Sequence, residues 1–361
     1  MLFRSLGVLH LATEALAQLG IEGRTADRVR AAALLHDVGH TPYSHNIEAV
    51  VERRTGRSHQ AVTDLISSGP VASALEDHGL APDRIADLVA GEGQFGQLIS
   101  GELDVDRMDY LVRDAHHTGV PYGTIDHGRL VRELAFIDGQ LVLAEGNVQT
   151  AESLLLARAL MNPTVYNHHV ARIGKSMLRR ATERLVEVSD LDAAELRRMD
   201  DHDLLVSLRT TPETTEAAQR IAHRDLYKRA VWAEMAAVPE PVIDASYADR
   251  RADEEAIAER AGVDPAAVIM DVPGRPTMAE STTRVVVSGE IRRLDEQSTL
   301  VSALRAAQRD QWRLGVYAPR EHVEAVGRAA ERVLGLEPTG ALVNDRRGYH
   351  ATLDDFDDSG R

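Results

Sequence analysis

Residues 36–45 read HDVGHTPYSH, so three histidines and an aspartate stand within ten residues. Gly39 and Pro42 predict that a helix ends inside this stretch, because glycine favours helix termini and proline cannot continue a helix. His45 and Glu48 then lie beyond the break and can turn back toward the first histidine. The stretch predicts a cluster of imidazole and carboxylate groups at one helix end.

The segment before this stretch predicts the helix that carries it. Thr25 is a candidate N-cap. At a period of about 3.6 residues, one face collects small apolar residues and two of the histidines: Val29, Ala32, Ala33, His36 and His40. Asp37 sits beside that face. In the alternative interpretation, the histidines simply favour the negative end of the helix dipole.

A second stretch, LDVDRMDYLVRDAHH, weighs against that alternative. Asp106, Tyr110 and Asp114 are spaced four apart and share one helix face. Asp109 and Arg113 can pair with each other on an adjacent face, which leaves Asp106 and Asp114 without an assigned partner. Buried carboxylates need a partner, and the chain has no cysteine, so metal ligation by imidazole and carboxylate is the simplest use of these acids.

Composition restricts the class of protein. The 361 residues are 43% hydrophobic, which is enough for a sizeable core. Without cysteine, disulfides, thiolate metal ligands and a cysteine nucleophile are excluded. The net charge of −16 and pI near 5.4 disfavour a nucleic-acid partner. No apolar run approaches the roughly 20 residues of a membrane span, and no signal-peptide pattern is present, so we expect a cytoplasmic protein without a membrane partner.

The pattern along the chain predicts a mainly α fold. Residues 5–235 show apolar spacing of three and four residues, as in a helical bundle. One interruption, LAFIDGQLVLA, places Asp138 and Gly139 between β-prone runs and predicts a small β-hairpin.

After residue 240 the pattern shifts to a smaller α+β domain, with strand-like AVIMDVP, RVVVSGEI and RLGVYAP and the helical EHVEAVGRAAERVLGL. We expect three parts: 1–239, 240–340, and an acidic disordered tail, 341–361.

Together, LLHDVGHTPYSH and LDVDRMDYLVRDAHHTG resemble the HD superfamily of metal-dependent phosphohydrolases, closest to its deoxynucleoside triphosphate triphosphohydrolase branch. VYNHHVARIGKSML and HRDLYKRA are similar to later segments of that branch, so the resemblance covers about residues 5–235. It implies an HD-domain helical bundle, a nucleotide substrate and a homo-oligomer.

The resemblance assigns a divalent metal ion (Mn, Mg, Fe or Zn) to His36, Asp37 and Asp106. Coordination would polarise a phosphoryl oxygen or supply hydroxide. The family has a further histidine ligand where this chain has Arg4, and a cation at that position would repel the ion unless it swings away or pairs with a phosphate.

The resemblance also implies roles for other residues. Four are expected on the phosphate side as catalytic groups: His40, His45, Glu48 and His59. Arg107 and Arg158 match cationic phosphate contacts, although either could instead be a solvated surface arginine, Arg158 above all. The deoxyribose side would be formed by Tyr110, Asp114 and Tyr166, and His168 is expected to point at the phosphates, in preference to His169.

The function that follows is hydrolysis of a deoxynucleoside triphosphate to deoxynucleoside and triphosphate. One alternative is an HD phosphohydrolase for another phosphomonoester or diester, because the metal site is shared within the class. Another is a nucleotide-binding regulatory protein with a degraded metal site, which Arg4 favours.

Overall fold

The computed structural model describes residues 2–336, so the predicted disordered tail at 341–361 lies outside the described residues. The chain forms two compact units. Of the described residues, the first unit contains 2–225 and 276–308, and the second contains 226–275 and 309–336. The division at residue 240 stays a prediction. The compact units follow the chain differently, because the segment Pro276–Gln308 returns to the first unit.

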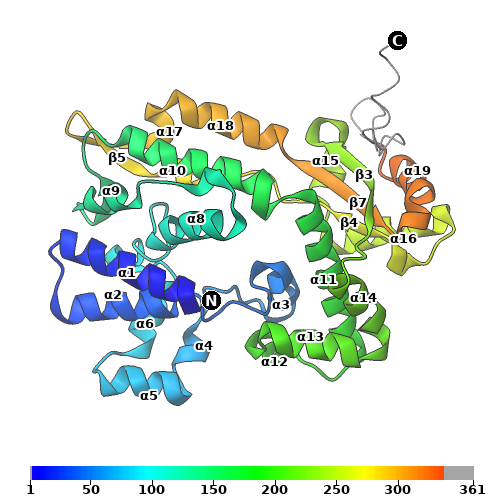
Figure 1. The fold of residues 1–361 in the computed structure, drawn as a ribbon, viewed down its shortest axis with the longest axis horizontal. Coiled ribbons are helices and arrows are strands. Elements are labelled where there is room, and N and C mark those ends of the chain that lie inside the picture. Colours follow the sequence, from blue (N-terminus) through cyan, green and yellow to red (C-terminus); the bar gives the residue numbers. More distant parts are fainter. Residues whose placement is uncertain (1, 337–361) are drawn as a thin grey trace, which may run out of the picture. The chain divides into compact units, whose positions relative to one another are not determined.

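The first unit is a helical bundle, which confirms the mainly α fold (Figure 1). Its helices are α1 (Leu2–Gln18), α2 (Gly23–Leu35), α3 (His45–Thr55), α4 (Thr63–Ile66), α5 (Gly69–Asp77), α6 (Pro82–Val89), α7 (Gly93–Gly96), α8 (Val105–Thr118), α9 (His127–Arg132), α10 (Val148–Met161), α11 (His169–Val188), α12 (Ala193–Arg198), α13 (Asp201–Thr210), α14 (Pro212–Ala222), α17 (Leu294–Gln297) and α18 (Thr299–Asp310). Short 3-10 turns cover Pro121–Gly123 and Ala279–Thr282, and a π-helical turn covers Asn162–Tyr166.

The helix α1 packs against both α2 and α8, and α8 also contacts α10 (Figure 1). The face of α1 that enters the core carries fully or nearly fully buried residues at helical spacing: Val8, Leu11, Ala12, Ala15 and Leu16. Gly7 permits close contact with α8, because a Cβ there would lie 2.0 Å from Oδ1 of Asp109. The approach places the first turn of α1 directly over the start of α8.

The helix that leads into HDVGHTPYSH is shorter than the sequence predicts. It begins at Gly23, so Thr25 lies inside α2 and is not its N-cap. It ends at Leu35, and residues 36–39 form turns, so His40 lies outside the helix. The predicted apolar face is correct: Val29, Ala32 and Ala33 are fully buried.

The predicted hairpin is present as β1 (Leu134–Ile137) and β2 (Gln140–Leu143), which pair antiparallel. Asp138 and Gly139 form the turn with φ of 51° and 76°, a conformation that favours this residue pair. The segment RVVVSGEI forms a second hairpin rather than one strand, with β5 (Arg284–Val287) and β6 (Glu290–Arg293). Because β2 pairs parallel with β5, the sheet order is β1-β2-β5-β6, within the first unit.

The second unit has the α+β character that the sequence predicts. Its sheet, ordered β3-β7-β4, consists of β3 (Lys228–Glu234), β4 (Ile269–Asp271) and β7 (Arg313–Ala318). Its helices are α15 (Glu240–Ile243), α16 (Tyr247–Ala261) and α19 (Val323–Val333), with 3-10 turns at Met235–Ala237, Pro265–Ala267 and Arg320–His322. The strand β3 corrects the helical prediction for 228–234, because these residues pair antiparallel with β7.

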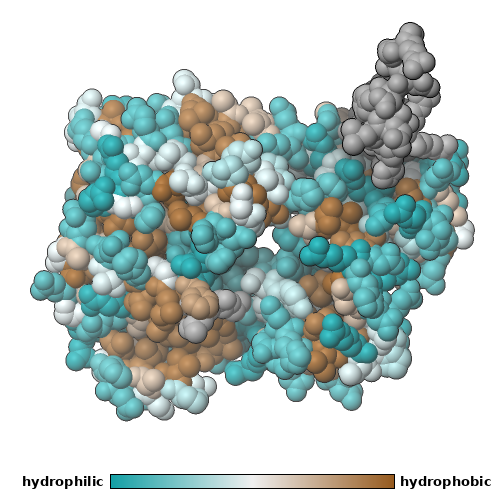
Figure 2. All heavy atoms as spheres, in the orientation of Figure 1, coloured by the Kyte–Doolittle hydropathy of each residue, from teal (hydrophilic) through white to brown (hydrophobic). Residues whose placement is uncertain are grey.

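Several large apolar side chains are exposed on the first unit. Phe3 is 78% and Leu6 46% exposed on α1, and Leu34 and Val38 are also exposed at the end of α2 and in the turn after it. Figure 2 shows hydrophobic surface in the region of α1 and α2, next to the N-terminus. Among the helices of residues 2–336, none combines the length and apolar character that crossing a bilayer requires.

Candidate active site

The first unit contains a cavity of about 660 Å³ between α1, α8, α10, α11 and the segments on either side of α3. This volume is in the range of small-molecule binding sites. The cavity is lined by Arg4, His36, Asp37, His40, Tyr43, Ser44, His45, Asn46, His59, Gln60, Val89, Ile99, Ser100, Asp104, Asp106, Arg107, Tyr110, Asp114, Arg158, Asn162, Tyr166 and Lys175. Residues from four separate parts of the sequence therefore meet at one place.

Local backbone geometry brings the two ends of the histidine stretch together. Gly39 lies so close to the segment after α3 that an added Cβ would be 1.9 Å from the carbonyl oxygen of His59. Tyr43 and Ser44 adopt positive φ values of 56° and 54°, which turn the chain into α3 at His45. The role of Gly39 is thus close packing of two backbone segments, in addition to the predicted helix end.

Arg4 is paired with the carboxylates of the site. Its Nε donates to Oδ1 of Asp106 over 2.8 Å, and its Nη2 donates to Oδ2 over 2.6 Å. The Nε atom is also 3.6 Å from Oδ2 of Asp37. The guanidinium carbon lies 5.2 Å from the ring centre of Tyr110, which adds a cation–π contact. Arg4 therefore faces both acids of the predicted metal site.

His36 lies between the same two acids. Its Nε2 is 3.2 Å from Oδ1 of Asp37 and 3.2 Å from Oδ1 of Asp106, and its Nδ1 meets the carbonyl of Ala33 at 2.7 Å. Burial opposes protonation of this imidazole, but the hydrogen bonds to Asp106 and Asp37 raise its pKa to about 10. Burial also opposes ionisation of Asp37, and the neighbouring His36 and Arg4 nevertheless lower its pKa. Two basic groups, Arg4 and His36, therefore lie against two carboxylates, those of Asp37 and Asp106.

The donors of His36, Asp37 and Asp106 converge as the resemblance implies, and their assignment as metal ligands stays a prediction. The donor set does not fit a divalent ion while the Arg4 pair is closed. Both oxygens of Asp106 are occupied by the guanidinium, and a second cation would be repelled at this distance.

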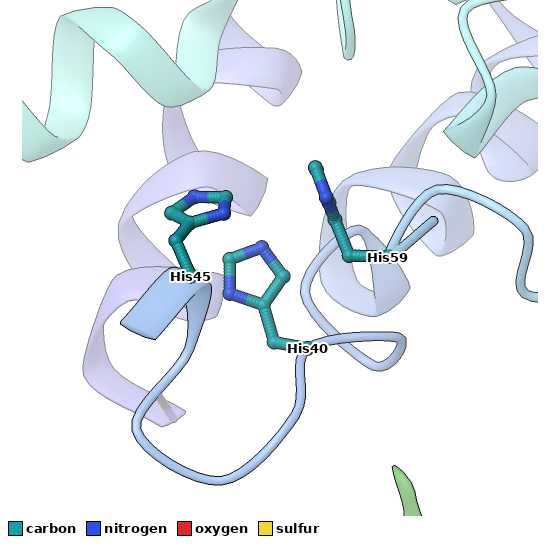
Figure 3. A group of neighbouring side chains, drawn as sticks. All are labelled: His40, His45 and His59. Carbon is teal, nitrogen blue, oxygen red and sulfur yellow. The ribbon is translucent and has the colours of Figure 1, made fainter. Parts of the chain in front are cut away.

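His40, His45 and His59 form a separate cluster whose rings face one another (Figure 3). Their ring centres are 4.6 to 4.9 Å apart. Burial lowers the pKa of His40 to about 4, so its imidazole is neutral near pH 7. Nε2 of His40 is 3.6 Å from Oδ1 of Asp37, which places the two parts of the site side by side.

Glu48 lies behind two of these histidines and is not among the residues that line the cavity. Its Oε2 accepts from Nδ1 of His45 at 2.8 Å, and its Oε1 accepts from Nδ1 of His59 and, at 3.0 Å, from the backbone N–H of His59. Burial opposes ionisation of Glu48, but the hydrogen bonds from His45 and His59 lower its pKa. Because an ionised carboxylate can only accept hydrogen bonds, the Nδ1 atom of His45 and that of His59 each carry a proton.

Aromatic and acidic groups also line the cavity. The hydroxyl of Tyr166 donates to Oδ2 of Asp114 over 2.9 Å, and the rings of Tyr110 and Tyr166 meet edge to face, with centres 5.9 Å apart. The predicted face of α8 is therefore formed as expected, with Asp106, Tyr110 and Asp114 all in the cavity wall. The separate pair of Asp109 and Arg113 is also present, at 2.7 and 2.8 Å.

Three basic side chains besides Arg4 line the cavity. Arg107 donates to the carbonyls of Gly101 and Glu102 over 3.0 and 2.6 Å, so it is held by the loop before α8. Arg158 lines the cavity rather than the outer surface, and burial lowers its pKa. Lys175, which the sequence analysis missed, lines the cavity and donates to the carbonyl of Tyr166 over 2.8 Å.

His168 is not among the residues that line the cavity, although the sequence predicts that it points at the phosphates. It precedes α11 as the N-cap residue, and its ring centre is 4.3 Å from that of His169. Asp104 is a further cavity residue that the analysis missed. It caps α8 by accepting from the backbone N–H of Arg107 over 2.6 Å, and burial raises its pKa. An aspartate immediately before a helical pattern was a visible signal for this cap.

Comparison with known proteins finds two family matches. Residues 2–114 match the HD domain, and residues 125–345 match the HD associated region. An uncharacterized protein of Methanocaldococcus jannaschii is 29% identical over 340 residues, which cover 89% of this chain and 69% of the relative. The deoxynucleoside triphosphate triphosphohydrolase SAMHD1 homolog of Dictyostelium discoideum is 27% identical over 257 residues, covering 62% of this chain and 49% of the relative.

A crystal structure of a phosphohydrolase from Bacteroides thetaiotaomicron shares the fold. Its TM-score is 0.68 at 23% identity, and the match covers 88% of this chain and 86% of that one.

The helical bundle, the His-Asp pair and the match of residues 2–114 to the HD domain define an HD-type hydrolase. The chain belongs to the family of HD-domain proteins that carry the HD associated region.

Proposed function

We propose that the chain hydrolyses deoxynucleoside triphosphates to deoxynucleoside and inorganic triphosphate, as a cytoplasmic enzyme. The observation that carries this proposal is one cavity that brings basic and imidazole side chains together with two tyrosines and Asp114, which accepts a hydrogen bond from the Tyr166 hydroxyl. Such a cavity matches a ligand with a polyanionic end and a sugar. The name of the Dictyostelium relative, a deoxynucleoside triphosphate triphosphohydrolase, supports the same substrate class.

The phosphates would lie against the basic side chains. Arg107, Arg158 and Lys175 line the cavity, and fixed cations in a low-dielectric cavity stabilise charge that develops on phosphate oxygens. Arg107 is held by two backbone carbonyls, so its guanidinium is already in place before substrate binds.

The deoxyribose would lie against Tyr110, Asp114 and Tyr166. Asp114 already accepts from the Tyr166 hydroxyl, and its remaining lone pairs can accept from a 3′-hydroxyl. The Tyr166 ring would occupy the space that a 2′-hydroxyl needs, so a ribonucleotide would bury a hydroxyl without a partner.

In the proposed reaction, the oxygen of water bonds to the α-phosphorus and the bond from this phosphorus to the 5′-oxygen breaks. The leaving 5′-oxygen takes up a proton from an imidazole of the cluster, His45 or His59, and the proton that the attacking water releases returns to that imidazole, because histidine exchanges protons near neutrality. His45 and His59 are oriented for this by Glu48, which holds both Nδ1 atoms. The products are the deoxynucleoside and triphosphate.

The test is triphosphate release from each of the four deoxynucleoside triphosphates and, for comparison, from the ribonucleotides and simple phosphate esters. The proposal expects triphosphate and nucleoside in equal amounts, with the deoxy form preferred. Turnover of another phosphomonoester or diester, without triphosphate release, would refute deoxynucleoside triphosphates as the substrate. It would not contradict membership of the HD hydrolase class.

One observation favours a second function. The closed pair of Arg4 and Asp106 occupies ligand atoms of the predicted metal site, as expected in a nucleotide-binding regulatory protein. Tight nucleotide binding without turnover would support that second function.

We also propose a homo-oligomer, which the exposed Phe3 and Leu6 would help to form. Light scattering of the purified chain would test this assembly, and a monomer at all concentrations would refute it.

A further inference from the structure

The strongest feature outside the predicted metal ligands is the cluster of His40, His45 and His59. One ring nitrogen from each lies within 4.8 Å of one from each of the others. Within residues 2–336, this is the group of histidine and acidic residues close enough to share one ion. His36, Asp37 and Asp106 form a separate group around Arg4.

Glu48 prepares two of these rings for a ligand. It binds the Nδ1 atoms of His45 and His59, which fixes both tautomers and leaves the bare Nε2 lone pairs on the other side of each ring. A carboxylate behind a histidine is the usual support of a metal-binding imidazole, since it orients the ring and increases its basicity. One glutamate here serves two histidines at once.

His40 supplies an independent indication. Its side chain is only 4% exposed, yet its Nδ1 has no hydrogen-bond partner among the described residues. A buried polar nitrogen without a partner is costly. Because Gly39 packs against the carbonyl of His59, the segments that carry His40 and His59 are held together by the backbone itself.

We propose that His40, His45 and His59 bind one transition-metal ion of the Zn²⁺ or Co²⁺ type, distinct from an ion at His36, Asp37 and Asp106. Neutral imidazoles favour such ions over Mg²⁺ or Ca²⁺, which prefer oxygen. The fourth position of a tetrahedral ion would face the cavity, as in sites with three protein ligands and an exchangeable one.

The geometry requires a small adjustment. In a tetrahedral site with bonds of roughly 2.0–2.1 Å, ligand nitrogens lie about 3.4 Å apart, so the rings would close inward. His45 can make this change, because its side chain is 60% exposed and rotation about its side-chain bonds is unhindered by core packing. His40 and His59 would keep their places.

The test is metal binding by the full chain, measured as ion stoichiometry by calorimetry and elemental analysis with Zn²⁺ and Co²⁺. The wild type is expected to bind one ion tightly. His45→Ala and His59→Ala are expected to weaken binding at least tenfold, whereas the matched Asp106→Asn and His36→Ala variants retain it. Circular dichroism of each variant checks that it folds.

X-ray absorption of the Zn²⁺-loaded wild type gives a second readout that needs no variant. Multiple scattering from three imidazoles is expected, whereas the predicted family site would give one imidazole and two carboxylates. Binding lost in Asp106→Asn, a spectrum with one imidazole, or no binding by the wild type would each overturn the proposal. A ring nitrogen of His45 or His59 that binds an ion cannot at the same time carry a proton and donate it to substrate. Triphosphate release without any ion at this cluster would therefore retain the proposed function and refute this site.

Discussion

The guanidinium of Arg4 and the carboxylate of Asp106 form a two-pronged ion pair across the cavity, with contacts of 2.8 and 2.6 Å. Gly7, one turn along α1, permits this approach, because α1 contacts α8 where a side chain at Gly7 would collide with Asp109. A cation fixed in the chain thus stands beside the two acids that the family resemblance assigns to a metal.

Replacing this cation with a ligand should change metal binding. We expect Arg4→His to bind one more Mn²⁺ or Fe²⁺ ion per chain than the wild type, because the change removes a positive charge and adds an imidazole beside His36, Asp37 and Asp106. Calorimetric titration would measure the stoichiometry. Arg4→Gln is the matched control, since it removes the charge without adding the imidazole. Equal stoichiometry in the wild type and Arg4→His would show that Arg4 is not what keeps an ion from His36, Asp37 and Asp106.

Gly39 should tolerate no side chain. We expect Gly39→Ala to lower the free energy of unfolding by about 1–3 kcal/mol, the usual cost of overpacking, because its Cβ would collide with the carbonyl of His59. Denaturant unfolding would measure this loss. Gly274→Ala is the control, since no atom lies within 4 Å of a Cβ placed there, and its change should stay within about 0.5 kcal/mol. Equal effects of the two substitutions would contradict the packing argument.

The Tyr166 ring and hydroxyl should have separable effects on the proposed reaction. Tyr166→Phe keeps the ring beside Tyr110 and removes the donor to Asp114, so turnover should fall while the preference for deoxyribose remains. Tyr166→Ala removes the ring, so the preference should fall by about tenfold or more. The ratio of kcat/KM for deoxy- and ribonucleotides measures this preference. An unchanged ratio in Tyr166→Ala would show that the ring does not determine the preference for deoxyribose.

Much of the fold follows from local pattern. The buried face of α2, the acidic and aromatic face of α8 and the Asp138–Gly139 turn each depend on residues a few positions apart, so the sequence predicts them. The strand β3 is less visible, because its pairing depends on a distant partner, β7. The return of Pro276–Gln308 to the first unit has the same cause.

The site likewise has residues that local sequence predicts and residues that it does not. Histidines within HDVGHTPYSH are close in sequence, and the cavity contains both His40 and His45. Glu48 behind the rings and Lys175 from α11 depend on tertiary packing, so the sequence predicts that Glu48 turns back toward the histidines, but not its two contacts, and misses Lys175. The position of Arg4 opposite a ligand residue is visible in the sequence, but its pairing with Asp106 is not.

The last prediction concerns the segment that carries His59. Nη1 of Arg197, in α12, donates to both oxygens of Asp64 over 2.8 and 2.9 Å, and its Nη2 donates to the carbonyl of Ala61. The Arg197 side chain is 3% exposed, so this contact ties α12 to the residues directly after His59. Burial opposes ionisation of Asp64, but the hydrogen bond from Arg197 lowers its pKa in the folded state.

A carboxyl group with a lowered folded-state pKa stabilises the protein above its unfolded pKa of about 3.9, and this contribution is lost as the pH falls through the folded pKa. Asp64→Asn cannot ionise. The wild type should therefore exceed Asp64→Asn in free energy of unfolding by the largest margin near pH 7, and the margin should shrink below about pH 4. Urea unfolding at a series of pH values measures it. A margin that is constant with pH would mean that Asp64 contributes through shape and hydrogen bonding alone, without its charge.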